Sequence, residues 1–296
     1  IYFLKDKFRK SEVKPMNIQH ELNRVVIITG AGSGLGRSMT IALAEVGCSV
    51  AAVDINIDRL KNLSTETQNL DGEIFPICLD ISEVRNCISI VKQTLQKFER
   101  VDALVNNAGV SIAIINPEFR RNKVMFWDVP EEKWDQMFDI NVKASFIIAK
   151  AAVPYMIRQA WGRIVNVTTS LDTMIRPSWT PYGPSKAALE AASANWAGDL
   201  SDKNVTVNVL IPGGPANTNF VPGITKRERA RLVQPDVMKE PIKWLISNES
   251  EHFTARRLIA HNWDNNLMPD QAAQMASTSI AWQSLGRQAA TEPVPS

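Results

Sequence analysis

Cysteine and histidine are scarce in this chain of 296 residues, and their scarcity excludes several kinds of site. The three cysteines, Cys48, Cys78 and Cys87, are odd in number and show neither a C-x-x-C pair nor the spacing of metal ligands. Cysteines without a pairing pattern predict a reduced protein of the cytoplasm. The three histidines are widely separated along the chain. We therefore expect no metal site and no Ser-His-Asp triad.

Long apolar runs and an excess of charge are also missing. No run approaches the ~18 apolar residues that a membrane span needs, and the first 20 residues lack the pattern of a signal peptide. The formal net charge is +2, and residues 1–20 alone hold five basic and two acidic residues. This balance favours neither a membrane nor a nucleic acid as a partner. We interpret residues 1–20 as an N-terminal extension.

Apolar runs of strand length alternate with helical patterns along most of the chain, which is typical of βαβ units around a parallel sheet. Seven strands are predicted, at 25–29, 50–53, 74–78, 103–105, 163–167, 205–211 and 257–260. Helices are predicted near 35–46, 57–70, 82–98, 131–151, 182–200 and 239–247. Right-handed crossovers place such helices on both faces of the sheet. We expect one α/β domain over 21–268, a Rossmann-like doubly wound seven-stranded parallel sheet, with a C-terminal extension at 269–296.

Two connections, 111–130 and 212–238, are long for a compact domain. Long ordered loops usually carry function, so these segments are candidates for a substrate site. Trp127 and Trp179 lie in segments that would border a substrate. Three arginines are candidates for binding an anionic group of a substrate, namely Arg120, Arg121 and Arg176. The substrate itself stays open, because no sequence pattern fixes the shape of such loops.

The first predicted strand runs directly into a glycine-rich segment, residues 29–36. A strand, a glycine turn and a helix start together aim backbone N–H groups and a helix dipole at an anion, which is typical of a phosphate site. The spacing G-x-G-x-x-G fails at Leu35, and the P-loop pattern G-x-x-x-x-G-K-S/T fails at Ala31 and Arg37. The pattern that fits is T-G-x-x-x-G-x-G.

Asp54 ends the second predicted strand, eighteen residues after Gly36. An acidic side chain at this place accepts hydrogen bonds from the ribose diol of an adenosine and repels a 2′-phosphate. We therefore expect NAD(H) as the cofactor, with NADP(H) less favoured. Arg37, beside the last glycine, is the residue that argues for NADP(H).

Tyr182 and Lys186 are four residues apart at the start of an alanine-rich helical stretch. This spacing puts the phenol and the ammonium on one helical face. An unperturbed phenol has a pKa of about 10. A neighbouring Lys⁺ and a cationic nicotinamide favour the phenolate, so we expect the pKa of Tyr182 to be lowered. Tyr182 is therefore the predicted general acid/base.

Taken in order, these motifs resemble those of the short-chain dehydrogenase/reductase family over about residues 22–264. T-G-x-x-x-G-x-G and Y-x-x-x-K are its signatures. The run Asn106-Asn107-Ala108-Gly109 is similar to the family's N-N-A-G, Asn141 to its helix asparagine, and Pro212-Gly213 to its P-G. The segment 162–170 resembles the strand that leads to the family's active-site hydroxyl.

The resemblance implies an NAD(P)-dependent oxidoreductase that transfers a hydride between nicotinamide and a carbonyl/alcohol substrate. It implies a cofactor site made of Gly30, Ser33, Gly34, Leu35, Gly36, Asp54, Asp80, Ile81, Asn107, Tyr182, Lys186, Pro212, Gly213 and Thr218. In this set Asp80 and Ile81 flank the adenine, and Asn107 lies along the cofactor. The family's P-G-x-x-x-T has one added residue here, so Asn217 or Thr218 takes the place of the threonine.

The catalytic residues implied by the resemblance are Asn141, Thr169, Ser170, Tyr182 and Lys186. Lys186 bonds the nicotinamide ribose, and Asn141 holds a water that connects Lys186 to solvent. The family's hydroxyl is usually a serine thirteen positions before the tyrosine, which here is Thr169. We therefore favour Thr169 over Ser170 as this hydroxyl. A continuing strand would send Ser170 to the face opposite Thr169, so both could reach one site only if the strand ends there.

Two further expectations concern partners and rival functions. The resemblance implies a homodimer or homotetramer, packed through the helices predicted at 131–151 and 182–200. An enoyl reductase is disfavoured by the three-residue gap in Tyr182…Lys186, and an epimerase by the glycine pattern. The alternative from another class is a nicotinamide-binding sensor or scaffold protein without turnover, which would predict a broken catalytic set. Asn141, Tyr182 and Lys186 are all present.

Overall fold

A single eight-stranded sheet crosses the part of the protein that the computed structural model describes, residues 23–283. The strands are β1 (Val25–Thr29), β2 (Ser49–Asp54), β3 (Ile74–Cys78), β4 (Ala103–Asn106), β5 (Gly162–Val167), β6 (Val205–Ile211), β7 (Arg256–Ile259) and β8 (Ser277–Ser279). Their order is β3-β2-β1-β4-β5-β6-β7-β8, and β1 to β7 are parallel. The predicted doubly wound α/β fold is confirmed. The expected extension at 1–20 lies outside the described residues.

The eighth strand corrects the prediction of seven parallel strands. β8 runs antiparallel to β7, and it follows α10 (Pro269–Met275). Both elements come from the segment expected to be a C-terminal extension, where Ala273 and Ile280 are fully buried. The strand reads Ser-Thr-Ser, so no apolar run marks it in the sequence. An edge strand needs no such run, because it is paired on one side only.

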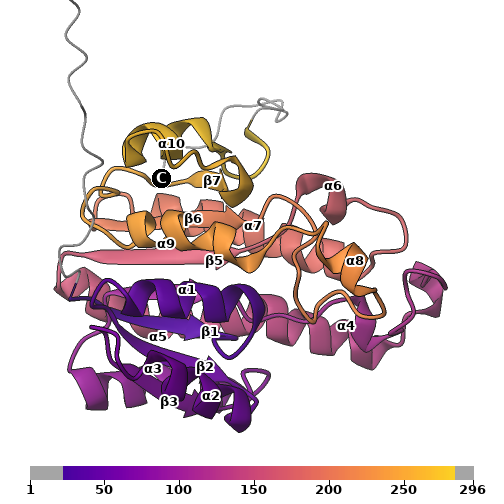
Figure 1. The fold of residues 1–296 in the computed structure, drawn as a ribbon, viewed down its shortest axis with the longest axis horizontal. Helices are drawn as coiled ribbons and strands as arrows, with labels where there is room; N and C mark the ends of the chain where they lie inside the picture. The colour runs from indigo at the N-terminus through magenta and orange to yellow at the C-terminus, as the bar shows by residue number, and fades with distance from the viewer. Residues whose placement is uncertain (1–22, 284–296) are drawn as a thin grey trace, which may run out of the picture.

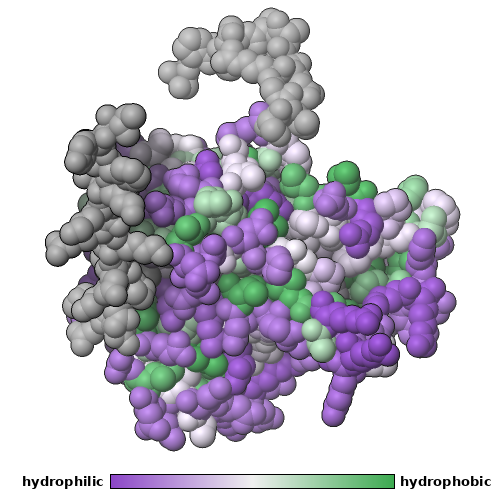
Figure 2. Space-filling model, turned by 45° about the horizontal axis from the view of Figure 1, so that its top comes forward, coloured by the Kyte–Doolittle hydropathy of each residue, from purple (hydrophilic) through white to green (hydrophobic). Residues whose placement is uncertain are grey.

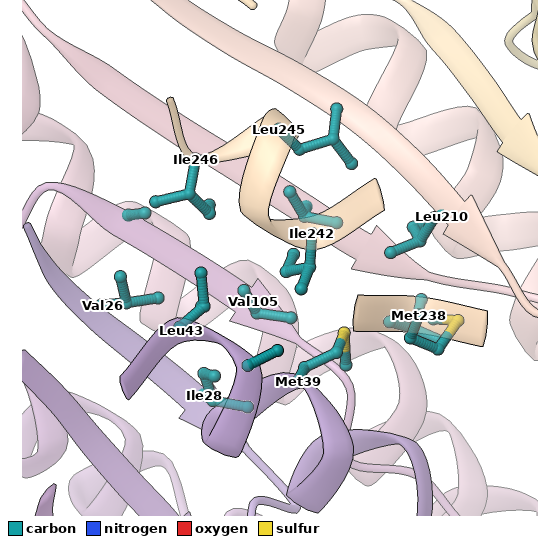
Figure 3. Close-up of a cluster of buried hydrophobic side chains, with 14 of the residues drawn as sticks. Val26, Ile28, Met39, Leu43, Val105, Leu210, Met238, Ile242, Leu245 and Ile246 are labelled. Atoms are coloured by element: carbon teal, nitrogen blue, oxygen red, sulfur yellow. The ribbon is translucent and has the colours of Figure 1, made fainter. Parts of the chain in front are cut away.

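Helices cover both faces of the sheet (Figure 1). One face packs against α1 (Gly34–Ala44), α2 (Ile57–Thr67) and α9 (Lys239–Leu245). The other face packs against α3 (Val84–Phe98), α5 (Ala144–Arg158) and α7 (Tyr182–Asp199). Alternate residues of β1 face the two cores, with Val26 and Ile28 in the first and Ile27 in the second. Figure 3 shows the first core, where side chains of α1 and α9 meet those of the strands.

The helix predicted at 131–151 is longer and is interrupted. It consists of α4 (Glu131–Phe138), a π-helical turn (Asp139–Lys143) and α5. By length and composition alone, Glu131–Arg158 would pass for a membrane span. Its residues Ile148, Ala152 and Met156 are fully buried in the core beneath the sheet, which is how a helix of a folded domain meets the same test.

The two long connections have structure of their own. Residues 111–130 contain the short 3-10 turns Ile112–Ile114 and Phe126–Asp128, and a small apolar cluster of Ile112, Phe119 and Val124 holds them together. Residues 212–238 contain α8 (Lys226–Arg229) and the turn Pro235–Met238. Figure 1 shows α8 at the same end of the molecule as α4 and α6 (Leu171–Met174). In the space-filling view, hydrophobic residues form small groups among hydrophilic ones (Figure 2).

Candidate active site

A cleft of about 630 Å³ lies beyond the carboxyl ends of β1, β4, β5 and β6. This edge of a doubly wound sheet is the usual place for a ligand. The predicted site residues that line it are Gly30, Ser33, Gly34, Leu35, Asn107, Thr169, Ser170, Tyr182, Lys186, Pro212, Gly213 and Thr218. The predicted residues that are not among those lining it are Gly36, Asp54, Asp80, Ile81 and Asn141. The structure therefore brings most of the predicted residues together.

The glycine loop forms one half of the cleft. Gly30 and Gly34 have positive φ angles of 66° and 53°, a conformation that L side chains rarely adopt. A Cβ on Gly36 would lie 2.1 Å from the carbonyl oxygen of Gly30, so helix α1 can approach the loop only through a glycine. A Cβ on Gly34 would lie 2.7 Å from Cγ2 of Thr218, across the cleft. The loop is thus a cradle of bare backbone that fits the diphosphate of a dinucleotide.

Thr29 and Asn107 hold this loop in place. The Thr29 hydroxyl accepts hydrogen bonds from the backbone N–H groups of Asn107 and Ala108, both at 3.0 Å. The Asn107 amide nitrogen Nδ2 donates to the Thr29 carbonyl at 2.9 Å and to the Gly30 carbonyl at 3.3 Å. Asn107 therefore lines the cleft while its side chain ties the segment after β4 to the glycine loop.

Asp54 lies at the end of β2, where each of its carboxylate oxygens accepts a hydrogen bond from a backbone N–H group. Oδ2 accepts from the Gly32 N–H at 3.0 Å, and Oδ1 accepts from the Asn56 N–H at 3.0 Å. Arg37, the residue that argued for NADP(H), pairs with Glu66 on the surface. The basic residue that reaches the cleft here is Arg59, which the sequence analysis did not single out. Arg59 is far from the glycine motif in the sequence, and no sequence pattern links the two.

Tyr182 is the first residue of α7, and Lys186 follows one turn later on the same face. Gly183 allows this placement, because a Cβ there would lie 2.4 Å from the Met174 carbonyl oxygen. Both reactive side chains are buried, with 7% and 3% of their surface exposed. The Lys186 ammonium donates a hydrogen bond to the Val167 carbonyl at 2.9 Å.

Burial shifts both pKa values. It raises the pKa of Tyr182 to about 12 by disfavouring the phenolate, and a side-chain hydrogen bond with Thr169 opposes this only in part. Burial also lowers the pKa of Lys186 to about 8, because the ammonium is desolvated. In the chain without its dinucleotide, burial therefore shifts the pKa of Tyr182 upward, and the lowering expected beside a cationic nicotinamide stays a prediction. At neutral pH Tyr182 is a protonated hydroxyl, ready to donate.

The structure separates the two candidate hydroxyls. Thr169 lines the cleft beside Tyr182, and its side chain lowers the pKa of the phenol. Ser170 caps α6 instead, where its Oγ accepts from the Thr173 N–H and lies 2.8 Å from the Thr173 hydroxyl. β5 ends at Val167, so these residues belong to the turn that follows the strand.

Asn141 lies in the π-helical turn between α4 and α5 and is fully buried. Its side chain accepts from the Val110 N–H at 2.8 Å and donates to the Val110 carbonyl and the Ser185 hydroxyl, each at 3.0 Å. Its Oδ1 and the Lys186 Nζ both lie close to Gly109, at 3.0 and 3.4 Å from the position of a Cβ there. Asn141 thus ties the segment after β4 to the helix that carries Tyr182 and Lys186.

Thr218, and not Asn217, faces the glycine loop. Thr218 lines the main cleft opposite Gly34. The Asn217 side chain is held by Gln234 and Arg229, at 2.9 and 3.2 Å. The pattern after Pro212-Gly213 left Asn217 and Thr218 as alternatives. In the structure Thr218 is the one that lies at the cleft.

The profile of the short chain dehydrogenase family matches residues 24–229. The chain belongs to this family. Its fold and its glycine cradle fit the dinucleotide that the family uses, and it is an NAD(P)-dependent oxidoreductase. Among its relatives is 3-oxoacyl-(acyl-carrier-protein) reductase FabG of Thermotoga maritima, 31% identical over 241 residues, with 79% of this chain and 94% of that protein covered.

Two other family members give the same picture. The 7alpha-hydroxysteroid dehydrogenase of Escherichia coli K12 is 30% identical over 211 residues, which cover 71% of this chain and 78% of that protein. A crystal structure from Sinorhizobium meliloti 1021, described as a short-chain alcohol dehydrogenase, superposes with a TM-score of 0.72 at 26% identity, covering 82% of this chain and 96% of that one.

A buried ion pair behind the family's catalytic residues was missed by sequence reasoning. Glu190 on α7 and Arg257 on β7 are 0% and 3% exposed, and their Oε2 and Nη1 atoms lie 2.5 Å apart. The same carboxylate oxygen accepts from the Thr168 hydroxyl at 2.8 Å, and Nη2 of Arg257 donates to the Thr169 carbonyl. The pair thus fixes the turn that carries Thr169. No sequence signal joins two residues 67 positions apart.

Proposed function

We propose that this chain transfers a hydride between a nicotinamide dinucleotide and a carbonyl/alcohol pair, with Tyr182 as the general acid/base. The observation that carries the proposal is that Tyr182 and Thr169 line the same cleft, where the Thr169 side chain acts on the phenol and lowers its pKa. Two hydroxyls side by side, next to a cradle for a dinucleotide, supply a proton donor and a second donor to one substrate oxygen.

In the direction of reduction, each residue has a distinct task. The bound nicotinamide supplies the hydride. The neutral Tyr182 hydroxyl gives its proton to the substrate oxygen, and the Thr169 hydroxyl donates a hydrogen bond to the same oxygen as negative charge develops. Lys186, whose pKa of about 8 lies near neutrality, stabilises the phenolate that Tyr182 leaves behind. Asn141 positions the Lys186 helix, and the water expected at Asn141 stays a prediction.

A sensor or scaffold protein without turnover is the less favoured function. Such a protein has no need of Asn141, Thr169, Tyr182 and Lys186 together. Here Thr169, Tyr182 and Lys186 line one cleft, and Asn141 is tied to the first turn of α7 through Ser185. The Ser185 hydroxyl accepts from Asn141 and donates to the Tyr182 carbonyl at 2.8 Å.

The test is a panel of ketones and secondary alcohols, followed by NADH and NADPH absorbance. Tyr182→Phe is expected to lower kcat by roughly a thousandfold, because general acid/base catalysis contributes about 10²–10⁴-fold. Dinucleotide affinity should stay within about twofold, since the phenol only borders the cradle. Tyr155→Phe, on α5 away from the cleft, is the matched control and should turn over normally. Full activity of Tyr182→Phe would overturn the role of the tyrosine.

For the cofactor we propose NAD(H) over NADP(H). The support is Asp54 at the end of β2, a carboxylate that stays in place through its bonds to Gly32 and Asn56 and repels a 2′-phosphate. Arg37 is paired with Glu66, whereas Arg59 reaches the cleft and is the competing cation. Titration with both cofactors decides the preference. Tighter NADPH binding that is lost in Arg59→Ala would overturn the proposal and assign the preference to Arg59.

We also propose that the chain associates with itself through α4, α5 and α7. Aromatic side chains are exposed on these helices, with Trp134 40% and Phe146 46% accessible, and Phe146 lies 6.5 Å from the ring of Trp196. Exposed aromatic groups of this kind mark protein interfaces. Sedimentation at micromolar concentration should show a dimer or tetramer, and a species of 33 kDa alone would contradict this.

A further inference from the structure

Three aromatic rings form a wall beside the Tyr182 phenol. The ring centroids of Trp179 and Phe220 lie 5.7 and 5.8 Å from that of Tyr182, and Phe119 lies 5.7 Å from Trp179. All of these side chains line the cleft. They come from three separate segments: 111–130, the turn before α7, and 212–238. The two connections that are long for this fold therefore converge on the reacting hydroxyl.

The wall is held in one shape. Phe119 is 9% exposed and packs with Ile112 and Val124 in the small cluster of the 111–130 segment. Asn116 fastens the same segment, because its Nδ2 donates to the Asn122 carbonyl at 2.9 Å. The Trp179 carbonyl accepts from the Gly183 N–H at 2.8 Å, which ties Trp179 to the first turn of α7. A surface fixed before binding loses little entropy when a ligand settles on it.

The basic side chains that line this half of the cleft, among the described residues, are Arg120, Arg176 and Lys186. Arg120 pairs with Glu228, which also lines the cleft, at 3.7 Å. Arg176 lies over the ring of Trp179, with its guanidinium 5.3 Å from the ring centroid. Lys186 donates to the Val167 carbonyl. Within residues 23–283, Arg176 has no ion pair and lies over an aromatic ring instead, so aromatic rings form the surface next to the phenol, which disfavours small oxo acids.

Resting on the proposed function, we propose that the substrate is an uncharged ketone or secondary alcohol carried on a rigid skeleton of two or more rings. The rings of Phe119, Trp179 and Phe220 offer faces and edges for offset or edge-to-face contact with such a skeleton. Arg120 and Glu228, one from each long connection, both line the cleft and form an ion pair, so the two connections meet along the surface that the skeleton would contact. The carbonyl oxygen then lies at the Tyr182 and Thr169 hydroxyls.

The test compares four carbonyl compounds at saturating dinucleotide: a bicyclic ketone such as 2-decalone, cyclohexanone, acetone and pyruvate. For the wild type we expect kcat/KM to fall in that order. Phe119→Leu, which keeps an apolar side chain but removes the ring, should lower kcat/KM for 2-decalone about tenfold and for acetone by less than twofold. Phe220→Leu, at a more exposed position, should act in the same direction.

Phe126→Leu is the matched control. Phe126 belongs to the same 111–130 segment, packs edge-on against Trp127, and is 67% exposed outside the cleft. It should leave all four values unchanged. A preference for pyruvate, or equal losses for 2-decalone and acetone in both cleft variants, would overturn the assignment of a ring-bearing substrate while leaving the oxidoreductase function intact. Absence of turnover with every carbonyl and both cofactors would instead overturn the proposed function.

Discussion

The two halves of the cleft are made from different parts of the polypeptide. The dinucleotide half is made of backbone: Gly30, Gly34 and Gly36 leave N–H groups bare at the start of α1. The substrate half is made of side chains, with Phe119 and Phe220 contributed by loops. Adding a single Cβ to the glycines of the backbone surface would cause a clash, whereas a surface made of side chains changes shape with each substitution. One scaffold can therefore keep its cofactor while its substrate varies.

The sharpest test of this contrast is Gly36→Ala. Its Cβ would meet the Gly30 carbonyl at 2.1 Å and the Asn107 amide at 2.5 Å, so the loop must move. We expect dinucleotide affinity to fall by about a thousandfold or more, equivalent to ~4 kcal/mol, measured by fluorescence titration. Gly198→Ala is the control, because nothing lies within 4 Å of a Cβ at that position in α7. It should bind normally and gain up to about 1 kcal/mol of stability.

A second test measures how much the buried ion pair between Glu190 and Arg257 contributes to the stability of the fold. Glu190→Gln leaves the Arg257 charge buried without its partner, which typically costs about 3–5 kcal/mol of unfolding free energy. Replacing both residues by methionine should restore most of this loss. Lys61→Met, which breaks an exposed pair with Asp58, should not change stability measurably. Urea denaturation of the four proteins decides the matter, and equal stability of the single and double variants would contradict it.

A third test uses pH. The pKa of Lys186 is lowered from 10.5 to about 8 in the folded chain, so the unfolded chain binds more protons between these values and wild-type stability rises with pH there. Lys186→Met removes this rise. Relative to the variant, the wild type should gain up to about 3 kcal/mol between pH 8 and 10.5. The raised pKa of Tyr182 acts on both proteins alike. Parallel pH curves would show that Lys186 titrates normally.

The smallest expected effect separates Thr169 from Ser170. Thr169→Val should lower kcat roughly a hundredfold at saturating dinucleotide, because it removes one donor to the substrate oxygen. Ser170→Ala should lose about 1 kcal/mol of stability with its N-cap bond and keep its turnover. If only the serine variant loses turnover, the hydroxyl lies one residue further along the chain than we propose.

The backbone half of the contrast is also the half that the sequence predicts well. The strands at 25–29, 74–78 and 205–211 lie at the predicted residues, because each is a short run rich in apolar and β-branched side chains. Glycine spacing likewise marks the cradle, since positive φ angles and close approach admit few other residues. Each of these signals is local in the chain.

The side-chain half needed the structure. Trp127 and Trp179 were equal candidates for the substrate site, yet Trp179 lines the cleft and Trp127 is 66% exposed. Arg120 lines the cleft in an ion pair with Glu228, and Arg176 lines it over the ring of Trp179. Burial raises the pKa of Tyr182 in the chain without its dinucleotide, an effect that the sequence does not show. These outcomes depend on packing between distant segments, which no local pattern records.

The segment that follows β8 contacts the part of α7 that supports the Thr169 turn. The N–H of Ala281 donates to Oε1 of Glu190 at 3.2 Å, so the residue after the buried Ile280 contacts the carboxylate that fixes the Thr169 turn. Proteolytic cleavage just before Ala281 would remove this hydrogen-bond donor. The buried Glu190 Oε1 on α7, far from the cleavage site in sequence, would lose that partner. Catalytic rate thereby becomes a readout of whether this end of the polypeptide is seated, and a boundary drawn at residue 268 would sever the domain from part of its own active-site support.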